Sequence, residues 1–314
     1  MVSRLSPRAL AILALVGANV IWGSTFVALK PVLDRVPPLT VASLRFAIAL
    51  AILLPLVYLV GDRPARGRGP LLMGLTGVFL VYLCQNIGLQ YSSAANGALI
   101  HGGIPILTAL LAAAFLGERL GGRGLVGVLA SLVGVAVIVL PGIELGLSAL
   151  GHGLLLASAL SIAAYLVIGR RAFPAGGSLA TVAGAACYGF LMLLPATAVE
   201  LAVGGMDRPT TGDLLRLLYL GAGASALAFV LWAYGLCHFE AGRAATFANL
   251  NPLVGVALAA LLLGEPVTRL QLGGGALVLA GVWLAAHQPA AAPGSAGTLI
   301  GEGPTGAASV ARAS

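Results

Sequence analysis

The sequence predicts an all-α polytopic membrane protein with ten transmembrane helices, built as two inverted five-helix repeats. The first observation is composition, because the chain of 314 residues is 59% hydrophobic and only 9% charged, whereas a soluble domain carries roughly 25% charged residues. The second is that the apolar residues gather into ten runs, each near the ~20 residues that span a bilayer. The third is that one long segment, from Gly88 to Glu118, recurs between Gly235 and Glu265.

The expected helices follow one another with short connections, so no soluble domain interrupts the membrane part. The first run is longer than the core of a secretory signal, and no small-x-small cleavage site follows it, so it is taken as the first helix. The first repeat covers residues 10–140 and the second 150–287, with a short N-terminus at 1–9 and a tail at 288–314 that is expected to be disordered. The ten expected helices are roughly 10–30, 39–60, 70–89, 93–116, 124–140, 150–169, 178–200, 214–236, 242–263 and 270–287.

The repeated segment determines the expected topology. Eleven of its 31 aligned positions are identical at an offset of 147 residues. Ala and Leu identities arise by chance in apolar segments, so the informative matches are Pro105 with Pro252 and the Gly-Glu pair that closes each copy. Because each unit has an odd number of helices, the second unit enters the membrane from the other side, and the natural binding site lies near the midplane between the two halves.

The basic residues set the expected orientation. Ten of them lie on the face that carries the N-terminus and five on the opposite face, and Lys and Arg are enriched on the cytoplasmic side of membrane proteins. Both termini are therefore expected to be cytoplasmic. The ten are Arg4, Arg8, Arg63, Arg66, Arg68, Arg119, Arg123, Arg170, Arg171 and Arg243, and the five are Lys30, Arg35, Arg208, Arg216 and Arg269.

The repeated motif also carries a family resemblance. The pattern G-L-x-Y-x-x-A…P…L-L-G-E-R at 88–119, its second copy at 235–266 and the stretches 18–26 and 44–46 resemble the EamA-domain family of the drug/metabolite transporter (DMT) superfamily. The resemblance covers about residues 10–287. It implies two five-helix units with cytoplasmic termini, multi-pass insertion in a bacterial inner membrane, and export as the direction of transport. One departure is that the second unit has Ala163 where the first has Trp22, so an aromatic wall is expected in one half only.

The candidate residues for a substrate cavity are polar or aromatic side chains inside the expected helices. A polar group in hydrocarbon is costly, so each should face the protein interior; hydrogen bonding between helices explains any one of them about as well as substrate contact. The candidates are Trp22, Ser24, Thr25, Arg45, Tyr82, Gln85, Asn86, His101, Tyr165, Asn249 and Asn251. Trp232, near a helix end, is instead assigned to the interfacial belt.

Two prolines and two ionisable residues have more specific expected roles. Pro105 and Pro252 should kink the fourth and ninth helices, either around a central cavity or as a packing feature. Arg45 lies about six residues into the second helix, ~9 Å deep. Its side chain either extends to the interface or faces the cavity and meets a carboxylate or another anionic group of the substrate. His101 is the only His at a credible intramembrane position, and is therefore the candidate for proton coupling.

Glu118 and Glu265 are expected to have a structural or gating role. Each ends a helix, where a negative charge opposes the helix dipole. A hydrogen-bonded latch to a neighbouring loop or helix explains such a position better than helix propensity does. Arg269 is the expected partner of Glu265, and Arg119 and Arg123 are the expected partners of Glu118.

The function these features favour is secondary transport, most simply export of small polar or amphipathic metabolites such as amino acids by alternating access. The chain has no phosphate-binding loop of the Walker type, so it is not expected to hydrolyse ATP. Multidrug or toxic-cation efflux and metabolite uptake are alternatives, and a channel or an intramembrane enzyme fits less well. The expected partners are a small-molecule substrate and the lipid bilayer. The chain is expected to be a monomer or homodimer that binds no nucleic acid, metal or cofactor.

Overall fold

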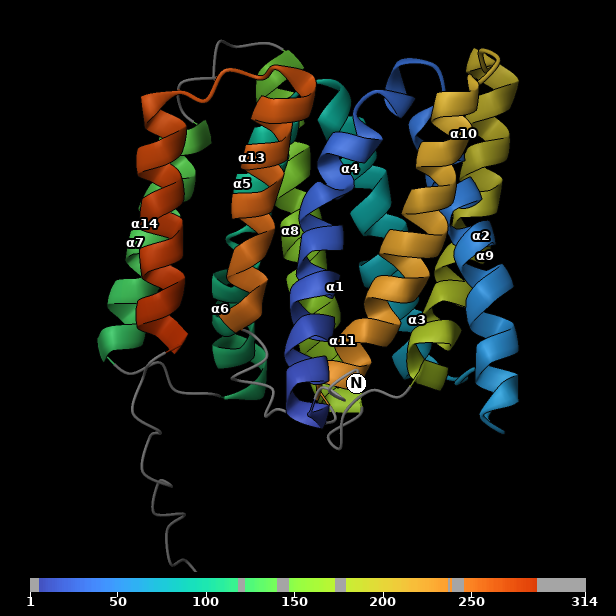
Figure 1. Cartoon of the computed structure of the whole chain (residues 1–314), viewed down its shortest axis with the longest axis horizontal. Helices are drawn as coiled ribbons and strands as arrows, with labels where there is room; N and C mark the ends of the chain where they lie inside the picture. Colours follow the sequence, from blue (N-terminus) through green and yellow to red (C-terminus); the bar gives the residue numbers. More distant parts are fainter. Residues whose placement is uncertain are drawn as a thin grey trace, which may run out of the picture.

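The computed structural model describes residues 6–117, 122–139, 147–172, 179–236, 238 and 246–286. The described residues contain helices and no strand, and the helices run alongside one another as a bundle (Figure 1). Seven helical segments are long and apolar enough to cross a membrane, and three shorter apolar helices, residues 122–138, 250–263 and 269–284, lie among them. The chain is therefore a multi-pass membrane protein.

The helices of the first half begin close to where the apolar runs predict them. The third apolar run is one continuous helix whose middle is π-helical, and the fourth is broken into two helices. The elements are α1 (Pro7–Leu29), η1 (Val32–Asp34), α2 (Pro38–Leu59), α3 (Arg68–Gly74), the π-segment η2 (Leu75–Phe79), α4 (Leu80–Gln90), α5 (Ala94–His101), α6 (Ile104–Leu116) and α7 (Gly122–Val139).

The second half contains the corresponding elements. Its third apolar run again has a π-segment in the middle, and its fourth begins with a short 3-10 turn. The elements are α8 (Leu147–Ala172), α9 (Leu179–Gly204), α10 (Thr211–Leu218), the π-segment η4 (Tyr219–Leu227), α11 (Ala228–Leu236), the 3-10 turn η5 (Thr246–Asn249), α13 (Leu250–Leu263) and α14 (Arg269–Ala286).

Local sequence explains where several helices begin. Ser6 caps α1, since its side chain accepts a hydrogen bond from Ala9 N at 3.2 Å, and Pro7 at the first helical position needs no intrahelical donor. Thr210 and Asp213 form a reciprocal capping box at the start of α10. These caps satisfy backbone donors that would otherwise lack partners at the helix ends.

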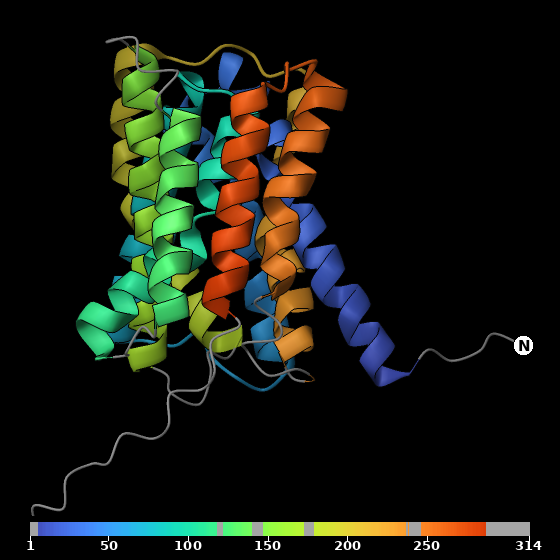
Figure 2. The ribbon, with the colours of Figure 1, turned by 90° about the vertical axis from the view of Figure 1, so that its left-hand side faces the viewer.

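Glycines allow the outer helices to pack closely. The helices α7 and α14 lie side by side at one edge of the bundle, which faces the viewer in Figure 2. A Cβ at Gly134 would lie 2.6 Å from the carbonyl oxygen of Gly274, and one at Gly281 would lie 2.4 Å from that of Gly127. Small residues at such crossings are typical of helix packing in membranes, where close backbone contact replaces the hydrophobic effect.

The bundle has two ends that differ in their contacts. The helix α1 begins and α14 ends at the same end, the lower one in Figure 1. At the opposite end, Glu200 at the C-terminal part of α9 accepts hydrogen bonds from Leu39 N at 3.0 Å and Thr40 N at 2.8 Å. This contact joins the end of α9 to the start of α2, so these two packed helices run antiparallel.

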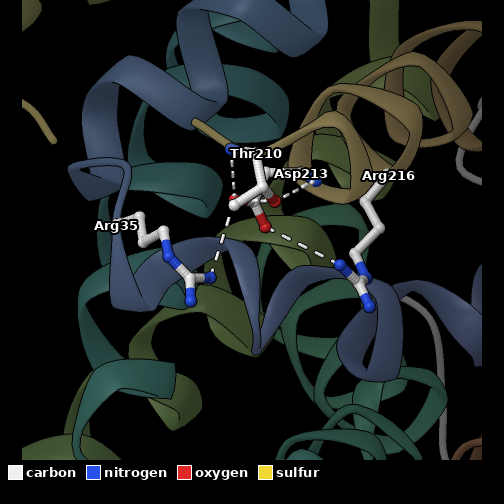
Figure 3. A network of polar contacts seen from close by, with 4 residues as sticks. All are labelled: Arg35, Thr210, Asp213 and Arg216. Carbon is white, nitrogen blue, oxygen red and sulfur yellow. Dashed lines mark hydrogen bonds and ion pairs between the residues drawn. The ribbon is translucent and has the colours of Figure 1, made fainter. Parts of the chain in front are cut away.

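A second polar network fixes the connection between α1 and α2 at this end (Figure 3). Asp213 is fully buried and lies 3.6 Å from Arg35 and 3.7 Å from Arg216. Its carboxylate also accepts from Thr210 N at 2.9 Å and Thr210 Oγ1 at 2.7 Å. A buried carboxylate needs such a set of charged and hydrogen-bonded partners, so Asp213 holds the first turn of α10 against the loop that carries Arg35.

Candidate functional site

The fourth apolar run is interrupted inside the bundle. The helix α5 ends at His101, and α6 begins at Ile104 with Pro105 at its second position. A Cβ at Gly102, in the interruption, would lie 3.2 Å from Cγ of Pro252 in α13. The interruption between α5 and α6 therefore lies against Pro252, near the start of α13.

His101 stands at this interruption. Its ring is edge-to-face with that of Phe26, with centroids 5.0 Å apart, and its Nε2 is buried without a hydrogen-bond partner. Asn251, in α13, likewise has a buried Oδ1 without a hydrogen-bond partner. Asn249 lies in the 3-10 turn η5. The region where the helices break thus holds polar atoms that the described protein groups leave unsatisfied.

The π-segments η2 and η4 lie at positions that correspond under the repeat offset of 147 residues. A π-segment turns the following side chains relative to a regular helix, and such segments are frequent at functional sites. The segment η4 carries Tyr219 and Ser225, and Tyr82 lies in α4 shortly after η2. Of the two segments, η4 contributes Tyr219 and Ser225 to the polar centre, and Tyr82 joins them from α4.

Arg45 is at that centre. Its residue is 2% exposed, its Nε donates to Ser225 Oγ, and its guanidinium carbon lies 4.6 Å from the centroid of the Tyr82 ring. The Tyr82 ring is in turn edge-to-face with Phe46 at 4.9 Å. Arg45 therefore points into the protein and does not extend to the interface, as the snorkelling alternative required, and its Nη1 has no hydrogen-bond partner.

Trp22 is surrounded by aromatic rings of α11. Its indole Nε1 donates to Ala224 O at 3.1 Å, and its ring lies 5.4 Å from Phe229 and 5.5 Å from Trp232. Trp232, which the sequence assigns to the interfacial belt, contacts Trp22 through its ring. Two residues after Trp22 in α1, the hydroxyl of Ser24 is hydrogen-bonded to the hydroxyl of Tyr219.

Other candidates are held by their own surroundings. Tyr165 of α8 packs on Gly77, where an added Cβ would overlap its ring. Thr25 Oγ1 donates to Ile21 O of its own helix at 3.3 Å. Asn86 Nδ2 donates to Pro38 O at the start of α2 at 2.8 Å, which is an interhelical bond of the kind expected as the structural alternative. Gln85 is buried in α4.

Glu265 is a backbone cap. Its two carboxylate oxygens accept from Ala94 N at 2.9 Å and Ala95 N at 3.0 Å, the first residues of α5. A carboxylate is stabilised at a helix N-terminus by the free amides and the dipole. The sequence suggested Arg269 as the partner, but the latch is made to a neighbouring helix. Gly264, with φ of +66°, turns the chain at the end of α13 so that the Glu265 side chain can return.

The end of α6, which carries the matching Gly-Glu pair, has the same backbone turn as the end of α13. Gly117 ends α6 with φ of +70°, whereas Glu118 lies outside the described residues. At the Glu265 end of the bundle an open surface depression of about 540 Å³ is lined by Lys30, Asn96, His152 and Glu265, among others. Lys30 Nζ donates to the carbonyl oxygens of Leu89 at 2.6 Å and of Ser92 at 2.7 Å, and so closes the end of α4.

Two residues of the centre were missed from the sequence, Tyr219 and Ser225. Both are polar positions in the small-residue run Y-L-G-A-G-A-S of an apolar helix, and that pattern is the signal that could have found them. Their role depends on the packing of η4 against α2 and α1, which no local pattern reports.

Comparisons with known proteins agree with this architecture. The EamA-like transporter family matches residues 9–140 and 149–286. The "Probable terminal-alkyne amino-acid exporter" of Streptantibioticus cattleyicolor is 33% identical over 291 residues, which cover 87% of this chain and 92% of that protein. The "Probable amino-acid metabolite efflux pump" of Salmonella typhimurium is 31% identical over 280 residues, covering 84% and 91%.

A solved crystal structure has the same fold, with a TM-score of 0.63 at 22% identity, covering 88% of this chain and 96% of that one. The family match spans most of the sequence in two blocks, and the structure supplies the apolar helices that a membrane transporter requires. The chain belongs to the EamA-like transporter family.

Proposed function

We propose that the protein is a secondary exporter of small polar or amphipathic metabolites, with amino acids or related compounds as the favoured substrates. The observation that carries this proposal is the buried centre formed by Arg45, Tyr82, Ser225 and Tyr219. Its members come from both halves of the chain, as expected for a carrier with a site between two units. The names of the two relatives, an amino-acid exporter and an amino-acid metabolite efflux pump, favour the same substrate class.

The proposed architecture is two inverted units of five helices each, over residues 10–140 and 150–287. Support comes from close contacts that occur as equivalent pairs. A Cβ at Gly74 would lie 2.6 Å from Ala185 O, and a Cβ at Gly221 would lie 2.9 Å from Arg45 O. Gly74 and Gly221 are separated by the repeat offset of 147, and Arg45 and Ala185 by the offset of 140 that aligns the second helices.

The crossing of α7 and α14 obeys the same rule. The contact of Gly134 with Gly274 corresponds to the contact of Gly281 with Gly127, because each residue of one pair lies 147 positions from a residue of the other. Reciprocal pairs of this kind are the signature of a two-fold relation. The termini on one side of the membrane, in the cytoplasm of a bacterial cell, complete the proposed topology.

Alternating access would use the interruption between α5 and α6 and the 3-10 turn at the start of α13. The helices α5 and α13 contact each other where Gly102 meets Pro252, and Glu265 of one unit caps α5 of the other. Rocking of one unit against the other would pivot at the first contact and would make or break the second. Such rigid-body motion around a fixed site is the usual mechanism of repeat-built carriers.

The buried guanidinium supports some of the alternatives more than others. A permanent positive charge at the centre repels organic cations in a medium of low dielectric, so it disfavours toxic-cation efflux. Uptake of the same metabolites would use the same site and differs from export only in the direction of transport.

An export screen tests the proposal. Cells that overproduce the protein would be loaded with amino acids, nucleosides and toxic cations, and the release of each compound would be followed by mass spectrometry beside cells that carry the empty vector. We expect faster release of one or more amino acids. Release of cations alone, or accumulation of amino acids against the vector control, would contradict the proposed function.

A further inference from the structure

Arg45 carries a charge that the described protein groups leave uncompensated. It is 2% exposed, one nitrogen is held by Ser225, and Nη1 is buried with no hydrogen-bond partner. The phenol rings of Tyr82 and Tyr219 lie near the guanidinium. The carboxylate of Asp213 is paired with Arg35 and Arg216.

An unpaired buried charge is among the most destabilising features a protein can contain. An arginine side chain stays protonated in proteins, so loss of a proton does not remove this cost. Position excludes lipid as the compensating group, because Arg45 is the eighth residue of α2, ~10 Å along the axis from its start, and is covered by α4 and η4. None of the described residues supplies a hydrogen bond to Nη1, and an anionic group that enters the bundle would fill this position.

We infer that Arg45 is the residue that binds a carboxylate of the transported substrate, and that carboxylate-bearing metabolites are the substrate class. This inference rests on the proposed function of the same site. Ser225 and the face of Tyr82 hold the guanidinium in one plane and leave Nη1 as a donor for a charge-assisted hydrogen bond. The repeat counterpart of Arg45 is Ala185. The two units therefore have one such buried charge between them, and one carboxylate is bound per carrier.

Removal of the Arg45 charge is expected to leave the stability of the substrate-free protein unchanged or to raise it. If Arg45 serves the substrate and not the fold, Arg45→Met removes an uncompensated buried charge, so the substrate-free protein should melt at the same or a higher temperature than the wild type. If Arg45 is a structural residue, the same variant should melt lower. Arg171→Met is the matched control, since Arg171 is exposed at the end of α8, and its melting temperature should not change.

Transport is tested with the full chain in proteoliposomes. One set is loaded with an equimolar mixture of the standard amino acids other than Asp and Glu, and a second set with the corresponding α-amides, which lack the carboxylate. Release is measured by mass spectrometry against protein-free vesicles. We expect the wild type to release acids and not amides, and Arg45→Met to lower the apparent affinity for acids about tenfold or more, as for loss of a hydrogen bond to a charged group. Arg45→Lys should retain part of the activity.

The outcomes separate this inference from the proposed function. Equal release of amides by the wild type, or undiminished release of acids by Arg45→Met, would overturn the inference and leave a transporter. No release of either mixture by the wild type would reject the proposed function and the inference with it. A lower melting temperature for Arg45→Met would show a structural role. Stabilisation of the wild type by sodium chloride over sodium sulfate, with none from the amino-acid mixture, would assign the site to a halide ion instead.

Discussion

The crossing of α7 and α14 allows a sharp test of the packing, because two adjacent glycines of α14 face different surroundings. A Cβ at Gly274 would lie 2.7 Å from Gly134 O and 2.7 Å from Cγ1 of Ile138, while a Cβ at Gly273 would meet nothing within 4 Å. Both are helical, so Ala at either position gains the same helix propensity, up to about 1 kcal/mol. The Gly274→Ala clash is with a backbone oxygen, which can relax only if the two helices separate.

Overpacking of this kind costs about 1–3 kcal/mol, and the comparison cancels the propensity term. We therefore expect Gly274→Ala to lie about 1–3 kcal/mol below Gly273→Ala in free energy of unfolding, measured by reversible denaturation in mixed detergent micelles. Gly273→Ala should match or exceed the wild type. Equal stability of the two variants would refute the close crossing, and with it one of the reciprocal contacts on which the inverted repeat rests.

Three further predictions follow. Glu265→Ala removes both acceptors for the first amides of α5 and should lower stability by about 1–2 kcal/mol; Glu265→Gln should fall between it and the wild type, and equal stability of all three would rule out the cap. Asp213→Ala removes a capping box and a buried carboxylate, and should lower the thermal midpoint more than Arg35→Ala does, since Arg35 is half exposed. His101→Gln should abolish pH dependence of transport; an unchanged pH profile would exclude His101 from proton coupling.

The sequence was informative about Arg45 and Tyr82 for a physical reason. A charged or polar side chain inside an apolar run must face the protein interior, and the structure places both there. Their partners were not accessible to the same reasoning. Ser225 and Tyr219 reach the centre because η4 is π-helical and packs on α2, and neither the extra residue per turn nor the neighbouring helix has a local signature.

Glu265 shows the same limit in another form. Its position after Gly264 at a helix end indicated a latch, since propensity disfavours a carboxylate there. The latch partners are backbone amides of Ala94 and Ala95, and amides are present at every residue, so side-chain pairing with Arg269 was the only partner the sequence could suggest. The distance of Trp232 from a helix end likewise gives no indication that Trp22 lies beside it.

The opposite orientation of the two units is tested most directly by the two loops that correspond in the repeat. Asp62 follows α2 and Asp207 follows α9, both exposed. Asp62→Cys and Asp207→Cys would each be made in a chain without Cys84, Cys187 and Cys237, and treated with a membrane-impermeant maleimide in intact cells and in inside-out vesicles. We predict labelling of position 207 in cells and of position 62 in inside-out vesicles. Labelling of both positions from the same side would contradict the inverted repeat.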